Sequence, residues 1–182
     1  MESICSDDRA VIHAQIGRSP RGLLGVAVRC DYGYPQVIRV SPWVDGAPFP
    51  TLFWLTCPYL SKAIDRLEAD GWIGRLERRL AEDPMLQEEM ERAHRRYIGA
   101  RAAMLTAEDR HAVEAAGTEP SLSARGIGGI ADWRRLKCLH LHVAHELADA
   151  NPIGRRVCEM LPTLQCPADE VRCRRRAAEP GG

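Results

Sequence analysis

Short apolar runs separated by turn residues dominate the first third of the chain. Three runs, at residues 23–30 (LLGVAVRC), 35–40 (PQVIRV) and 51–57 (TLFWLTC), are rich in Val, Ile, Leu and aromatic side chains. Gly, Pro or Asp residues lie between them, as is typical of β-strands joined by turns. Because the three runs lie so close together in the sequence, we expect a small, mainly antiparallel sheet near the N-terminus.

The chain beyond residue 58 shows the spacing of apolar positions that is typical of amphipathic helices. Pro58 and Pro84 suit a first helical position, and Thr106 with Asp109 resembles a capping box. Helices are predicted at 6–17, 58–71, 72–82, 84–105, 106–117, 132–150 and from 152 onward. The fold class is therefore α+β: several helices pack the sheet, and the C-terminal two-thirds is helical.

One domain accounts for this pattern, because no internal repeat or linker divides it. We predict a single α+β domain over residues 1–166 and a disordered tail over the Arg-rich residues 167–182. No apolar run approaches the ~20 residues that cross a bilayer. The first residues are acidic where a signal peptide is basic. We therefore expect a cytoplasmic protein with no membrane segment.

Charge balance narrows the classes of partner. Lys plus Arg and Asp plus Glu number 25 each, so the formal net charge is zero, which argues against a nucleic-acid binder. The segment 84–105 carries Glu/Arg pairs at helical spacing, which favours an exposed, charged helix. Such a surface can dock a protein partner. A metal-free regulatory or adaptor protein is therefore one functional alternative.

The segment KCLHLHVAH holds one cysteine and three histidines and is the most function-like feature of the sequence. On a helix, Cys138, His142 and His145 fall within an arc of roughly 60°, and His140 lies nearer the apolar side. On a strand, the alternation would instead group Cys138, His140 and His142. We favour the helix, because Asp132 can cap it and the following ELADA is helix-forming.

Thiolate sulfur and imidazole nitrogen are donors that zinc and similar metals prefer, so this cluster predicts a zinc or iron site. Cys57 is the leading candidate for a further ligand, because it precedes Pro58 at a predicted helix N-cap, a position that lowers a thiol pKa. The hypothesis is a metal site of Cys57, Cys138, His142 and His145. The rival interpretation is plain core packing, since buried Cys behaves as a small hydrophobe.

The role of such a metal stays open. A site with a ligand position free for water or substrate would be hydrolytic, and a closed site would be structural. The seven cysteines of the chain, in a reducing compartment, favour free thiols or metal ligands over a disulfide framework. The sequence therefore does not decide whether the protein is an enzyme.

A second candidate site would bind an anion. In ARGIGGIADW, Arg125 and three glycines precede a predicted helix, whose first amides can hold a phosphate. Arg18 and Arg21 in GRSPRG add positive charge. Together Arg18, Arg21 and Arg125 form a candidate site for a phosphorylated small molecule. Neither segment has the GKS or GKT of a P-loop, so a flexible connector is the preferred interpretation.

Three segments together resemble a bacterial family called domain of unknown function 501. They are GRSPRGLLGVAVRCDYGYPQVI, DGAPFPTLFWLTCPYL and ARGIGGIADWRRLKCLHLHVAHELADANPIG, and the resemblance spans residues 8–166. The LTCP and KCLHxHxAH motifs are typical of that family and contain Cys57, Cys138, His140, His142 and His145. The resemblance implies a small cytoplasmic bacterial protein, and it brings no assigned activity and no established metal.

Overall fold

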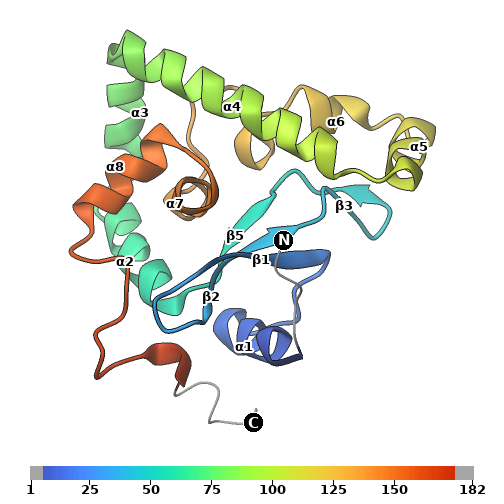
Figure 1. The fold of residues 1–182 in the computed structure, drawn as a ribbon. Coiled ribbons are helices and arrows are strands. Elements are labelled where there is room, and N and C mark those ends of the chain that lie inside the picture. Colours follow the sequence, from blue (N-terminus) through green and yellow to red (C-terminus); the bar gives the residue numbers. More distant parts are fainter. Residues whose placement is uncertain (1–5, 175–182) are drawn as a thin grey trace.

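The computed structural model describes residues 6–174, in which a small antiparallel sheet is surrounded by helices (Figure 1). The sheet has the order β1 (Leu23–Arg29), β2 (Pro35–Val40) and β5 (Phe53–Leu55), with both neighbouring pairs antiparallel. The short strands β3 (Trp43–Val44) and β4 (Ala47–Pro48) form a separate ribbon. The predicted antiparallel sheet is confirmed. Its third strand is shorter than the apolar run that predicted it.

Helices make up most of the chain beyond β5. Their bounds are α1 (Ser6–Ile16), α2 (Pro58–Ala69), α3 (Trp72–Glu82), α4 (Pro84–Met104), α5 (Ala107–Ala115), α6 (Glu119–Ser123), the 3-10 turn η1 (Ile127–Gly129), α7 (Leu139–Ala148) and α8 (Pro152–Met160). The α+β class with a helical C-terminal two-thirds is confirmed. None of the helices described between residues 6 and 174 has both the length and the apolar character to span a membrane.

Local signals set several of the helix starts. Pro58 and Pro84 occupy first positions of α2 and α4, where a missing N–H costs nothing. The Thr106 hydroxyl accepts from the Asp109 amide, and the Asp109 carboxylate accepts from the Thr106 amide in return. This reciprocal pair is the predicted capping box, and it starts α5.

The helix α7 lies at the centre of the molecule, where Figure 1 shows it nearly end-on between α4, α8 and the sheet. It contacts β5, β1 and β2 on the sheet side and α8 and α2 on the helical side. Leu139, Leu141, Val143 and Ala144 are all buried there. Because α7 is covered on several sides, its burial joins the sheet to the helices in one hydrophobic core.

The start of α7 corrects one prediction. The sequence predicts a helix from Asp132, but residues 130–138 are irregular and the helix begins at Leu139. The Asp132 carboxylate accepts from the amide of Arg134, two residues on, which closes a local turn. Two glutamates of other helices then accept the amides of Leu136 and Leu139, at 2.8 and 2.6 Å. These carboxylates hold the segment outside a helix.

The segment after residue 166 differs from the predicted disordered tail over its described part. Val171 and Cys173 are buried, and the Gln15 side chain donates to the Cys173 sulfur at 3.2 Å. The Arg172 guanidinium lies over the Tyr59 ring of α2. Two apolar side chains on alternate residues therefore tie residues 167–174 to the domain. The rest of the predicted tail, residues 175–182, lies outside the described residues.

Candidate metal centre

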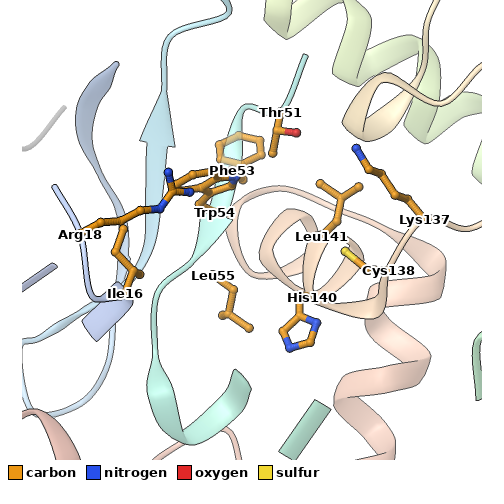
Figure 2. A pocket seen from close by; sticks show the side chains of 10 residues that line it. All are labelled: Ile16, Arg18, Thr51, Phe53, Trp54, Leu55, Lys137, Cys138, His140 and Leu141. Carbon is orange, nitrogen blue, oxygen red and sulfur yellow. The ribbon is translucent and has the colours of Figure 1, made fainter. Parts of the chain in front are cut away.

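A cavity of about 390 Å³ opens between β5 and the start of α7 (Figure 2). Phe53, Trp54 and Leu55 of β5 form one wall, and Leu141 of α7 faces them. Its volume lies within the roughly 300–1,000 Å³ of small-molecule sites, which are also mostly apolar with a few polar groups. The polar groups here include Cys138 and His140. The cavity therefore places two chemically versatile side chains against an apolar surface.

Cys138 and His140 come together with Glu68 of α2. One ligand atom from each residue, a sulfur, a ring nitrogen and a carboxylate oxygen, lies within 4.8 Å of the other two. All three side chains are half-buried. Cys138 is the N-cap residue of α7, in extended backbone, and His140 lies in the first turn of that helix. The group therefore bridges the last turn of α2 and the first turn of α7.

The position of Glu68 follows from the spacing of buried apolar residues along α2. Leu60 and Ile64 are buried, and Glu68 continues their stripe at the next i+4 position. A carboxylate on an apolar stripe must find hydrogen-bond partners. Glu68 accepts from the Leu139 amide at 2.6 Å and meets the His140 Nδ1 atom at 3.1 Å. It thus fixes both the start of α7 and one edge of the imidazole.

The other edge of the His140 ring is also held. Its Nε2 atom lies 3.2 Å from the Ser61 carbonyl oxygen and 3.3 Å from a carboxylate oxygen of Asp65. The hydrogen bond with Cys138 and the charge of Glu68 outweigh partial burial and raise the pKa of His140 from 6.5 to about 9. The ring therefore carries a proton at neutral pH, which a metal ion would have to displace.

Cys57 lies elsewhere, although the prediction that it caps a helix is confirmed. It is the N-cap residue of α2, but it is only 5% exposed. Burial outweighs the hydrogen bonds from the Leu60 and Tyr59 amides and raises the thiol pKa to about 11. The predicted lowering of that pKa is wrong, because loss of water disfavours the thiolate more than the helix terminus favours it. Cys57 is not in the group formed with Glu68.

His142 and His145 are buried side chains of α7. The His142 Nδ1 atom lies 3.3 Å from Asn151 Oδ1, and Asn151 Nδ2 lies 3.1 Å from His145 Nδ1. The His145 ring stacks on Phe53 and meets the edge of Tyr97. Burial lowers the pKa values of the two histidines to about 3 and about 4. Cys138 thus lies with Glu68 and His140. His142 and His145 instead belong to a hydrogen-bond network around Asn151.

The three arginines proposed for an anion site have separate surroundings. The Arg18 guanidinium stacks 4.9 Å from the centroid of Trp54, and Arg18 lines the cavity. Arg21 pairs with Asp45 at 2.8 Å. Arg125 donates to the carbonyl oxygen of Gly129 at 3.4 Å.

The glycine loop after Arg125 is neither a helix start nor a loose connector. The amides of Gly126, Ile127 and Gly129 donate within the loop or to the His94 ring, so they are not free to hold a phosphate. A Cβ atom at Gly126 would overlap the rings of His94 and Trp133, which stack on each other. Gly126 therefore packs closely against His94 of α4, and Gly128 and Gly129 pack against Leu141 and Pro50.

The family model described as protein of unknown function (DUF501) matches residues 26–159. This range covers most of the chain, and the chain therefore belongs to that family. The matched range contains Glu68, Cys138 and His140. No curated protein and no solved structure matches the chain.

Proposed function

We propose that this member of the DUF501 family binds a zinc or iron ion through Glu68, Cys138 and His140. The observation that carries the proposal is the convergence of their sulfur, nitrogen and oxygen donors within 4.8 Å. Metal–ligand bonds of about 2.0–2.3 Å place donors about 3–4 Å apart around one ion. Small side-chain rotations are therefore enough to close the set, and the backbone keeps its position.

The surroundings of the three residues support this assignment. A ligating histidine usually gives its second ring nitrogen to a carboxylate or a backbone carbonyl. With Nδ1 toward Glu68, the His140 Nε2 atom has both partners, in Asp65 and the Ser61 carbonyl. One thiolate and one carboxylate also balance the charge of a divalent ion, so the loaded site would be neutral.

Three protein ligands leave a position for water or substrate, as in catalytic zinc sites. Cys138 and His140 line the cavity, so that position would face it. A bound ion supplies Lewis acidity and lowers the pKa of a coordinated water. Hydrolysis of a ligand held in the cavity is therefore the reaction class that we propose.

Metal titration of the chelator-treated full chain, prepared without a His tag, tests the proposal. We expect one ion per chain, and a loss of affinity of more than about tenfold in Glu68→Gln, Cys138→Ser and His140→Ala. Cys30→Ser and His111→Ala are matched controls, because Cys30 is only partly buried and His111 is exposed. Both should bind like wild type.

The same titration separates two ligand sets. His142→Ala removes a ligand of the set predicted from the sequence but none of the set proposed from the structure. Loss of the ion in that variant, with retention in His140→Ala, would overturn the assignment to Glu68, Cys138 and His140. Absence of any bound zinc or iron in wild type would overturn metal binding itself.

A second function uses the same residues without a metal. Cys138 borders the cavity, bonds to His140 and precedes the amides of α7. This is the arrangement of a cysteine nucleophile beside a protonated histidine whose ring is oriented by a carboxylate. Alkylation by iodoacetamide in the presence of chelator distinguishes this candidate. Cys138 should then react much faster than Cys30, and His140→Ala should abolish the difference. Docking of a protein partner on the charged face of α4 stays a prediction.

A further inference from the structure

Two cations stand at the mouth of the cavity, on opposite walls. Arg18 lies beside Trp54 on the β5 side, and Lys137 lies on the α7 side, directly before Cys138 (Figure 2). The described residues that line the cavity include no aspartate and no glutamate. Each wall therefore carries one positive side chain, while the nearby carboxylates of Glu68 and Asp65 contact His140.

Neither cation is neutralised by a carboxylate within residues 6–174. Arg18 is exposed and stacks on Trp54, and Lys137, also exposed, donates to the Gly128 carbonyl oxygen at 3.3 Å. Nearby basic residues behave differently: Arg21 pairs with Asp45, and Arg135 pairs with Glu77. Carboxylates thus reach the neighbouring arginines, while the two cations at the cavity keep their charge available.

The cavity between the cations is lined mostly by apolar side chains. Phe53, Trp54 and Leu55 line it along β5, and Leu141 lines it from α7. The Thr51 hydroxyl lies near its upper end, on the side of the Lys137 ammonium group (Figure 2). Apolar walls of this kind bind a hydrocarbon or aromatic body, and a few polar groups at one end fix its orientation.

We propose that the cavity binds a small organic anion, a carboxylate or phosphate joined to an apolar body. Lys137 contacts the acidic group at the Thr51 end of the cavity, the apolar body covers Phe53 and Leu141, and Arg18 adds attraction from the far wall. This ligand class deepens the proposed function and rests on it for any reaction. Water would attack the phosphorus of a phosphate monoester and release phosphate and the alcohol of the apolar body, whereas a simple carboxylate would bind unchanged. The contact with the anion itself needs no metal, so it can be measured after the metal is removed.

Calorimetric titration of the chelator-treated full chain tests the proposal with four probes. Phenyl phosphate and benzoate carry both parts of the ligand, benzyl alcohol lacks the charge, and inorganic phosphate lacks the apolar body. Ionic strength is held constant, because screening alone changes the binding of anions. We expect at least one of the two aromatic anions to bind at least tenfold more tightly than benzyl alcohol and inorganic phosphate. The tighter of the two identifies the acidic group.

Variants of the two cations and of a control arginine test which side chains contact the bound anion. Lys137→Met should weaken binding of the preferred anion by about tenfold, and Lys137→Arg should restore most of it, as expected for one charge-assisted hydrogen bond. Arg18→Met should weaken it less. Arg21→Met is the matched control, because Arg21 is exposed and paired away from the cavity. Urea unfolding of each variant verifies that the fold is kept.

Three results would overturn the proposal: equal affinity for benzyl alcohol and the anions, an equal loss in Arg21→Met and Lys137→Met, or no binding of any probe. Titration with zinc and with iron, in the absence of a probe, keeps the two proposals apart. Anion binding by a chain that has affinity for neither ion supports the cavity ligand and removes the metal centre. Binding of either ion without anion binding does the reverse.

Discussion

Acidification should unfold the protein through three histidines in its core. His94, His142 and His145 are at most 2% exposed. Burial is the main cause that lowers their pKa values from 6.5 to about 4, 3 and 4, and the charge of Arg101 further lowers that of His94. Unfolding returns each ring to water, where its pKa is near 6.5. As the pH falls, the unfolded chain therefore binds protons before the folded one.

The direction and size of the effect follow from this difference. Stability is fully present above pH 6.5 and is lost as the pH falls toward the folded pKa values. At pH 5, an unfolded histidine is almost wholly protonated, while His94, with a folded pKa of about 4, is mostly neutral. This difference lowers the free energy of unfolding by about 2 kcal/mol per histidine. The summed loss of stability from three such histidines is comparable to the roughly 5–15 kcal/mol by which a domain is more stable than its unfolded chain.

Urea unfolding at pH 7 and pH 5, followed by circular dichroism, measures the loss. His94→Asn removes one titrating ring but keeps an acceptor for the Ile127 amide, which donates to His94 Nδ1 at 3.0 Å. Between the two pH values this variant should lose about 2 kcal/mol less than wild type. His111→Asn, at an exposed site, should lose as much as wild type. His140, whose pKa is raised, is present in all three chains, so its contribution cancels when their losses of stability are compared. Equal losses in the three chains would refute the reasoning.

Two further predictions concern packing. Gly154→Ala should lower the free energy of unfolding by about 3 kcal/mol, because the added Cβ atom would overlap a carbonyl oxygen of α7. Gly99→Ala, in open space on α4, should raise the free energy of unfolding by up to about 1 kcal/mol. Urea unfolding of the pair tests the contact between α7 and α8, and a similar effect at both sites would contradict it. Arg101→Met should cost about 3 kcal/mol or more, since buried Arg101 donates to three carbonyl oxygens in residues 122–126 that would lose their donor. A melting temperature within a degree or two of wild type would contradict this role.

The elements that the sequence predicted well are those decided within a few residues. Pro58 and Pro84 fix helix starts through their own ring geometry, and Thr106 with Asp109 closes a box across one turn. The sheet followed from apolar runs with turns between them. In each case the interaction partners lie inside the segment that carries the pattern, so no distant residue can override it.

The candidate site was predicted only in part, because its decisive contacts are not local. The sequence predicts Cys138 and His142 on one helix face. In the structure, the Glu68 carboxylate accepts the Leu139 amide, and the helix begins only after Cys138. His140 was assigned to the apolar side, and that side faces the cavity. Glu68 was missed. Its signal was present, as an acidic residue in line with Leu60 and Ile64, but its partner lies some seventy positions away.

The central place of α7 has a consequence for the order in which the protein is made. The sheet, α2 and α4 leave the ribosome before residues 139–148, around which they pack. Until then their apolar faces have no cover, and such surfaces favour aggregation or capture by chaperones. A nascent chain stalled before α7 should therefore be sensitive to protease, and protection should appear only after this helix emerges. Glu68 likewise meets Cys138 and His140 only after they emerge, so the proposed ligand set is complete only late in synthesis.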